Sequence, residues 1–161
     1  MTQFSSALSI FALWLAGIGL TAMTAIISWQ VFARYLLNSA PAWTEQAALL
    51  LMLWFVLFSA AAGVREGFHI RLSLIEQLSG PKTRKSLRLF SHLVVFFVGA
   101  MMAIEGSSLA IATWDHTIPT LGFSRSVAFW PFAGSGAMSV VFSAEHLFAE
   151  INDRKVQSLW N

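Results

Sequence analysis

Four long runs of apolar residues, separated by short polar links, set the pattern of this chain. The runs cover about residues 8–32, 46–64, 89–113 and 127–148. An α-helix rises about 1.5 Å per residue, so each run can cross most or all of the hydrocarbon core of a bilayer, which is about 30 Å thick. The pattern therefore predicts four transmembrane helices in an all-α fold.

The composition supports a membrane protein. Of the 161 residues, 57% are apolar and only 11% are charged, whereas soluble domains carry about 25% charged residues. A soluble fold of this size could not bury so much apolar surface. We expect one integral membrane domain over residues 1–161, and an uncleaved first helix because no Lys or Arg precedes its apolar run. The absence of cysteine excludes disulfides and thiolate metal sites.

Residues 69–79, between the second and third runs, follow a different pattern. Apolar and polar side chains alternate with helical spacing, so that one face holds Ile70, Leu74, Ile75 and Leu78 and the other holds Arg71, Ser73, Glu76 and Gln77. A short amphipathic helix of this kind lies in the plane of the membrane surface. We therefore expect an interfacial helix at residues 69–79.

The distribution of basic residues predicts the orientation. The link between the second and third runs and the C-terminal tail hold most of them: Arg65, Arg71, Lys82, Arg84, Lys85, Arg88, Arg154 and Lys155. The other two links hold Arg34 and Arg125. Because Lys and Arg accumulate on the cytoplasmic side, both termini are predicted to be cytoplasmic. Aromatic residues that favour the interface then gather at the outer boundary: Trp29, Tyr35, Trp43, Trp114 and Trp130.

Small residues recur at four-residue spacing within the runs, as in Gly99 with Ala103 and Gly106 with Ala110. Such pairs let helix backbones approach closely in lipid. Glu105 is the acidic residue well inside a run, and a carboxyl at that depth is a functional candidate. It fits either ion coupling or a hydrogen bond to a neighbouring helix, for example through Ser107 or Ser108.

His92 and His146 are predicted to lie at a similar depth on different helices, so they could in principle ligate a haem iron. The alternative is that both are interfacial polar residues. The sequence holds no Gly-rich phosphate loop, no nucleophile with a plausible base and no metal-ligand spacing, so we expect neither catalysis nor a cofactor. Its few basic residues flank apolar runs, which argues against nucleic-acid binding.

Two segments beside the second run form a recognisable motif. Before it stand residues 31–35 (Val-Phe-Ala-Arg-Tyr), Asn38 and residues 43–45 (Trp-Thr-Glu), and after it residues 63–70 (Gly-Val-Arg-Glu-Gly-Phe-His-Ile). The chain resembles the DctQ-type small membrane subunit of tripartite ATP-independent periplasmic (TRAP) transporters, and the resemblance extends to Leu121-Gly122 and Trp130-Pro131. It departs from the family at Gln46, where a second carboxylate is frequent.

The resemblance implies a scaffold for a large multi-span membrane subunit that imports an organic acid with sodium, delivered by a periplasmic binding protein. The sodium and substrate sites would then lie in the large subunit. Sialic acid, C4-dicarboxylates and other acids are all possible substrates. The residues alone leave open a self-sufficient oligomeric transporter that uses Glu105.

Structural or partner-contact roles are predicted for the motif residues Arg34, Tyr35, Asn38, Trp43, Glu45, Arg65 and His69. Arg34 and Glu45 flank one turn and could pair there, while Trp43 would anchor the turn at the interface. Arg65 and His69 would act similarly at the other boundary. Lipid contact at the interface is predicted for Arg71, Lys82, Arg84, Lys85 and Arg88. Ordinary snorkelling to the interface is the alternative for the motif residues.

Overall fold

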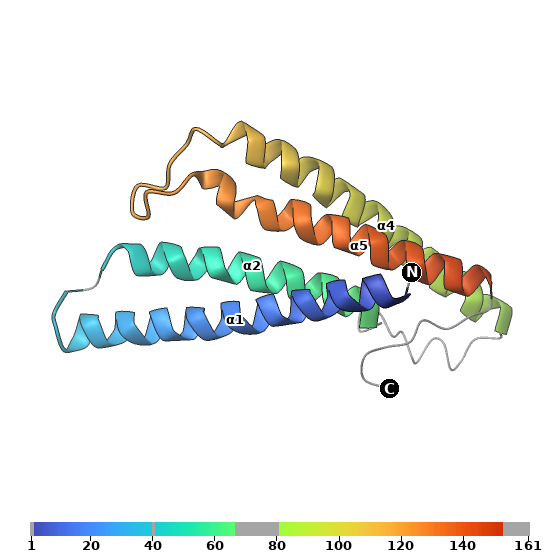
Figure 1. Ribbon diagram of the computed structural model, residues 1–161, viewed down its shortest axis with the longest axis horizontal. Helices are drawn as coiled ribbons and strands as arrows, with labels where there is room; N and C mark the ends of the chain where they lie inside the picture. Colours follow the sequence, from blue (N-terminus) through green and yellow to red (C-terminus); the bar gives the residue numbers. More distant parts are fainter. Residues whose placement is uncertain (1, 40, 67–80, 153–161) are drawn as a thin grey trace.

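The computed structural model describes residues 2–39, 41–66 and 81–152. Four long helices dominate it, namely α1 (Thr2–Tyr35), α2 (Trp43–Glu66), α4 (Pro81–Ala112) and α5 (Trp130–Ile151), and a short 3-10 helix, η1 (Arg125–Ala128), precedes α5 (Figure 1). Each long helix is long and apolar enough to cross a membrane, which confirms the prediction of four transmembrane helices. The interfacial helix predicted at residues 69–79 lies outside the described residues, and the cytoplasmic location of the termini stays a prediction.

The helices extend beyond the apolar runs at one end. α1 begins at Thr2 and α4 begins at Pro81, eight residues before the apolar run. Proline suits the first turn of a helix, because the amide hydrogen that it lacks has no partner there. α4 therefore carries its basic residues on a helical extension that continues past the apolar segment.

The first hairpin pairs α1 with α2 in antiparallel fashion (Figure 1). Small buried residues of α1 repeat at alternating spacings of three and four and face α2: Ser5, Ser9, Ala12 and Gly19. A side-chain Cβ at Gly19 would lie 3.0 Å from the Cβ of Phe55 in α2. This spacing is that of a left-handed helix pair, and the small residues allow the two helices to lie close together.

The second hairpin pairs α4 with α5, and glycines set its closest approach. A Cβ at Gly136 of α5 would lie 2.6 Å from the backbone nitrogen of Ala103 and 2.7 Å from the carbonyl oxygen of Gly99. A Cβ at Gly106 would lie 2.7 Å from the nitrogen of Ala133. The small residues expected to mediate close packing on α4 therefore do so, and α5 contributes a glycine of its own.

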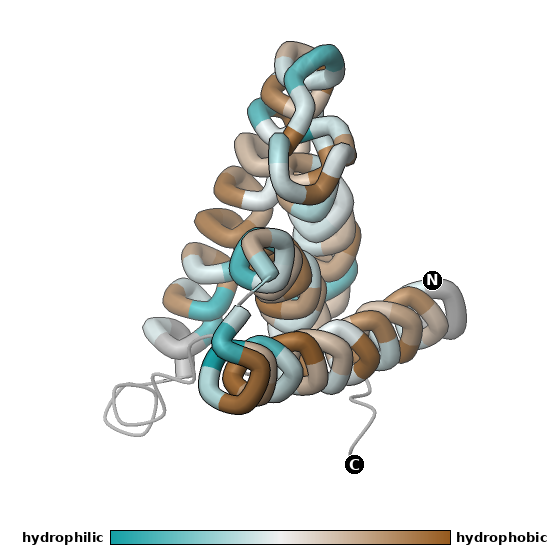
Figure 2. The backbone as a smooth tube through the Cα atoms, turned by 90° about the vertical axis from the view of Figure 1, so that its left-hand side faces the viewer, coloured by the Kyte–Doolittle hydropathy of each residue, from teal (hydrophilic) through white to brown (hydrophobic). Residues whose placement is uncertain are grey.

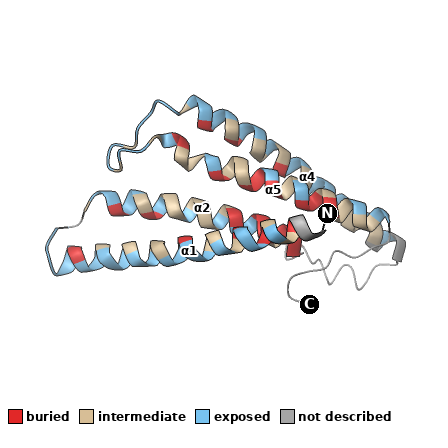
Figure 3. Ribbon diagram, in the orientation of Figure 1, coloured by how far each residue is buried: buried red, intermediate tan, exposed pale blue. Residues whose placement is uncertain are grey.

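The two hairpins meet through α2 and α5 and separate toward the turns that close them (Figure 1). We call the end with the start of α1 and the ends of α2 and α5 the joined end, and the end with residues 35–43 and 112–130 the splayed end. The apolar core lies toward the joined end and contains Ala12, Phe58, Ala61, Ala62, Val64, Met138 and Phe142. Figure 3 shows the buried residues concentrated there.

Away from this core, large apolar side chains cover the outer surfaces of the helices. Phe11, Trp14 and Ile18 of α1 and Phe90 and Met101 of α4 each expose more than half of their surface. Figure 2 shows the apolar residues distributed all around the helices instead of facing one centre. Such a surface suits lipid or another membrane protein.

The glycine crossing between α4 and α5 gives a direct test. Gly136→Ala would push a methyl group into the backbone of α4, so we expect the free energy of unfolding to fall by about 1–3 kcal/mol, as for other overpacked sites. The measurement is thermal unfolding in detergent. Gly17→Ala is the matched control, because nothing lies within 4 Å of a Cβ at Gly17. Equal losses for both variants would contradict this account.

Candidate functional site

The motif residues around the first turn lie at the splayed end, and most are exposed. Arg34 and Tyr35 end α1, and Trp43 and Glu45 lie in the first turn of α2. Tyr35 exposes 79% of its surface and Trp43 exposes 41%. Asn38 has a positive φ of 53°, a left-handed conformation that asparagine adopts more readily than most residues. Asn38 therefore has a structural role in reversing the chain.

Arg34 and Glu45 do not come together. Both side chains are exposed, and neither forms a hydrogen bond or an ion pair with another described residue. The start of α2 is instead fixed by Thr44, which is fully buried and whose hydroxyl donates a 2.7 Å hydrogen bond to the carbonyl of Pro41. The predicted Arg34–Glu45 pair is thus not formed, and Thr44, within the same motif, makes the local contact.

Arg65 anchors a buried polar cluster at the joined end, where α1, α2 and α5 meet. Its Nη1 donates to Oε1 of Glu66 at 2.9 Å, and each of these two side chains exposes only 3% of its surface. Its Nε donates to the hydroxyl of Ser5 in α1 at 3.4 Å. Breaking a buried pair by removing one partner is strongly destabilising, so the motif residue Arg65 contributes to the fold. A structural role at this boundary was predicted for Arg65, whereas Ser5 and Glu66 were not among the predicted residues.

His146 of α5 links the second hairpin to this cluster. Its Nε2 lies 2.9 Å from the carbonyl oxygen of Arg65. A carbonyl oxygen only accepts hydrogen bonds, so Nε2 must carry the hydrogen. His146 of the second hairpin thus caps a carbonyl in the last described turn of α2.

His92 of α4 extends the contact to the fourth helix. The His92 and His146 rings stack with centroids 4.8 Å apart and planes inclined by 3°, so the two histidines lie at the same depth, as expected. The lone pairs of imidazole nitrogens lie in the plane of the ring, and those of two parallel stacked rings do not converge on one iron. This arrangement does not fit bis-histidine haem ligation, and we interpret the stack as a contact between α4 and α5.

Glu145, next to His146, is a buried acidic residue that the sequence analysis missed. It exposes 7% of its surface, and neither carboxylate oxygen has a hydrogen-bond partner within the described part of the chain. Its signal in the sequence is its spacing: Glu145 follows Met138 and Phe142 by seven and three residues, on the face of α5 that enters the core. A polar group on such a face is costly to bury without partners.

The residues predicted to lie at the cytoplasmic boundary differ in how far the structure describes their side chains. Arg88 approaches Glu150 of α5, with Nη1 and Oε1 4.0 Å apart, and Lys85 is half-buried. Lys82 and Arg84 lie in the first turns of α4, but their side chains are outside what the structure describes. His69 and Arg71 also lie outside the described residues. Basic residues of α4 thus reach the joined end, where we predicted lipid contact.

Glu105 points away from its own chain. It is exposed on α4, and no described residue forms a hydrogen bond or an ion pair with it. Ser107, one of the partners considered, donates its hydroxyl to the carbonyl of Ile104 instead. The described residues hold no group of three or more potential metal ligands. Glu105 is therefore a single carboxyl without the converging ligands that an ion site needs.

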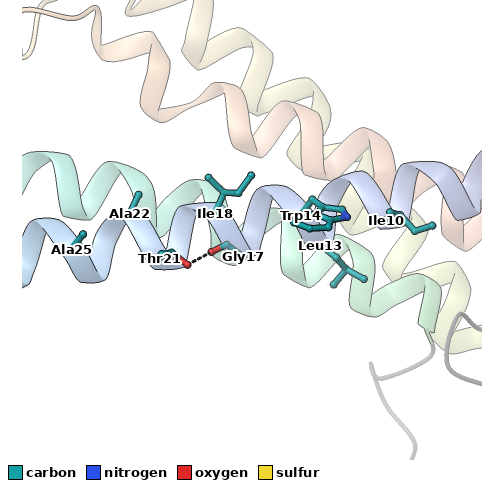
Figure 4. A pocket seen from close by; sticks show the side chains of 8 residues that line it. All are labelled: Ile10, Leu13, Trp14, Gly17, Ile18, Thr21, Ala22 and Ala25. Atoms are coloured by element: carbon teal, nitrogen blue, oxygen red, sulfur yellow. Dashed lines mark hydrogen bonds between the residues drawn. The ribbon is translucent and has the colours of Figure 1, made fainter.

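A groove of about 880 Å³ runs along the outer side of α1. Figure 4 shows its lining, which is mostly apolar. Its polar side-chain groups are the indole N–H of Trp14 and the hydroxyl of Thr21, and that hydroxyl donates to the carbonyl of Gly17 at 2.9 Å. Ligand sites normally combine apolar walls with several polar groups that fix orientation. The groove offers only the indole N–H of Trp14 besides this engaged hydroxyl, so it suits a lipid chain or an apolar helix better than a polar substrate.

The cap formed by His146 can be tested with a ring that lacks the donor. His146→Phe would keep an aromatic ring beside His92 but leave the carbonyl of Arg65 without this hydrogen bond, so we expect the free energy of unfolding to fall by about 1–2 kcal/mol. Thermal unfolding in detergent measures the change. The control is His116→Phe, at an exposed position of the link between α4 and η1. An unchanged melting temperature for His146→Phe would rule out a stabilising cap.

Replacing Glu145 is expected to stabilise the protein, in contrast to replacing His146. Glu145→Met replaces an unpartnered buried carboxyl with an apolar side chain of similar length, so we expect the free energy of unfolding to rise by about 1–3 kcal/mol. The same melting experiment measures it, with Asp115→Asn at an exposed position as the control. A lower melting temperature for Glu145→Met would mean that the carboxyl stabilises the fold.

Comparison with known proteins adds the family. Residues 23–153 match the model of "Tripartite ATP-independent periplasmic transporters, DctQ component". The sialic acid TRAP transporter small permease protein SiaQ of Vibrio cholerae is 27% identical over 129 residues, which are 80% of this chain and 75% of that protein. The sialic acid TRAP transporter permease protein SiaT of Haemophilus influenzae is 29% identical over 83 residues, which are 52% of this chain but only 14% of that permease.

The family match covers most of the chain, including the first turn, Arg65, Glu66 and His146 of the polar cluster, and all of α4 and α5. The four apolar helices agree with a protein that crosses the membrane several times. The chain is therefore a multi-pass protein of the bacterial inner membrane and belongs to the DctQ family of tripartite ATP-independent periplasmic transporters.

Proposed function

We propose that this chain is a non-enzymatic scaffold: it binds the large membrane subunit of a TRAP transporter and holds its fixed part in the bilayer while substrate crosses elsewhere. The periplasmic binding protein of the same system would deliver the substrate. In this role the small subunit supplies rigid helices and outward-facing contact surfaces. It needs neither a substrate site nor an ion site of its own.

The observation that carries this proposal is where the polar side chains of the helices lie. Arg65, Glu66 and His146 are engaged in contacts within the chain at the joined end. Within the described spans, the exposed Glu105 and the buried Glu145 lie on different helices, and no three potential metal ligands converge. A carrier needs converging groups for its ion or substrate near the middle of the membrane. The geometry therefore favours support of another protein over transport by this chain alone.

The relative from Haemophilus influenzae supports association with a large subunit. The matched segment makes up 14% of that permease, so a segment resembling part of this chain is joined to a much longer membrane polypeptide. We infer that the present chain associates non-covalently with a separate large permease. The exposed apolar surfaces of α1 and α4 offer the area for such an association.

The names of the relatives point to the cargo. Both are described as parts of sialic acid transporters, so we propose sialic acid, within the wider class of organic acids, as the substrate of the complex. We also propose that sodium drives uptake through sites in the large subunit. For this chain we propose cytoplasmic termini, an interfacial helix at residues 69–79 and lipid contacts of the basic residues. The recognising groups would lie in the partner proteins.

Reconstitution of the three components tests the proposal. We expect the large permease, this chain and the binding protein together to take up sialic acid into proteoliposomes when a sodium gradient is imposed. Omitting this chain should lower uptake at least tenfold, because the large subunit then lacks its support. Glu105→Gln should leave uptake within about twofold of the unaltered complex.

Other outcomes would favour different functions. Uptake by this chain alone, abolished by Glu105→Gln, would establish the self-sufficient transporter instead. Equal uptake with and without this chain would remove the scaffold role. Competition with excess succinate, a C4-dicarboxylate, tests the substrate: strong inhibition of sialic acid uptake would contradict the proposed specificity.

A further inference from the structure

Glu105 lies on a surface of α4 that faces away from every other described helix. The opposite side of α4, with Gly99 and Gly106, packs against α5. Spacings of three and four place Val98, Met101, Glu105 and Ser108 on the outward side, and we call these four residues the Glu105 face. Val98 exposes 52% of its surface and Met101 exposes 66%. The carboxyl thus lies between the apolar Met101 and the hydroxyl-bearing Ser108, and no other described helix covers it.

The depth of Glu105 makes this exposure unfavourable in lipid. It lies seven residues before the end of α4 at Ala112, which is about 10 Å along the helix axis. Side chains of an α-helix lean toward its N-terminus, so the carboxyl points back toward the middle of the span and not toward the nearer boundary. Snorkelling is therefore obstructed, and a carboxyl in hydrocarbon is expensive.

The described part of the chain forms no hydrogen bond or ion pair with the Glu105 carboxyl. Ser107 is bonded to its own helix through the carbonyl of Ile104. The described lysines and arginines of the four long helices lie near helix ends, as with Arg34, Arg65 and Arg88. A second copy of the chain, packed face to face, would set one carboxyl against another, and two such groups attract only when at least one of them is protonated. A hydrogen-bond donor from a different membrane protein has no such requirement.

We propose that the Glu105 face docks against a transmembrane helix of the large permease, and that this helix presents a hydrogen-bond donor, such as Lys, Arg, His or a hydroxyl, to the Glu105 carboxyl. The inference rests on the proposed function and adds to it the contact surface and the chemistry of the partner. Complementary polar groups fix register and partner choice between membrane helices that are otherwise uniformly apolar. The apolar neighbours of Glu105 would exclude lipid from the contact.

Co-purification of the complex in detergent tests the polar contact. The affinity tag is placed on the large permease, and the recovered amount of this chain is measured. We expect Glu105→Leu to lower recovery at least fivefold, and Glu105→Gln, which keeps an acceptor oxygen, to retain more than half of it. An equal loss in both variants would contradict a contact that depends on the acceptor oxygen of this side chain. The control Asp115→Asn, at an exposed carboxyl outside the helices, should leave recovery unchanged.

Photo-crosslinking supplies a readout that does not require altering Glu105. A photoreactive phenylalanine analogue at Met101 should crosslink to the large permease in membranes, whereas the same group at Ile18 of α1, which is similarly exposed at 61%, should react at least fivefold less. Crosslinks from Ile18 but not Met101, or full recovery of Glu105→Leu, would overturn the docking surface while leaving the scaffold role intact. Failure of the unaltered chain to co-purify with the permease would instead contradict the proposed function.

Discussion

The arrangement of the four helices depends on the contact between α2 and α5 at the joined end. In lipid the hydrophobic effect does little to bring apolar helices together, so close packing and buried polar contacts must do so. Here Phe58 packs with Met138 and Phe142, and His146 donates to the carbonyl of Arg65 beside the buried Arg65–Glu66 pair. A second link between the hairpins is the 3.0 Å hydrogen bond from the indole of Trp54 in α2 to the carbonyl of Val127 in η1.

The contacts within each hairpin differ in kind from the contacts between the two hairpins. Within hairpins, small residues bring backbones together, most closely where Gly136 meets Ala103 and Gly99. Between hairpins, specific polar groups add direction, because a hydrogen bond to one carbonyl fixes both depth and rotation. The result is a molecule whose hairpins are joined at one end and leave long helical surfaces uncovered toward the other (Figure 1).

These uncovered surfaces agree with a protein that completes its packing on a partner. α1 and α4 each touch mainly one neighbouring helix, and their outer sides carry large exposed apolar residues. Glu105 stands on one of these sides, where lipid would be a poor solvent for it. In the proposed scaffold, the buried polar groups stabilise the arrangement of the helices, and the exposed polar group on α4 contacts the partner.

The sequence by itself determined the four spans, the class of fold and the family, because the length of an apolar run and the residues of the motif are local properties. It also placed His92 and His146 at one depth. Only the tertiary structure decided that Arg34 and Glu45 do not pair, that Arg65 binds Ser5 sixty positions away, and that Glu145 is buried while Glu105 is exposed. The runs are apolar on every face, so they carry almost no signal for how each helix is rotated. That rotation is fixed by contacts between hairpins far apart in the sequence.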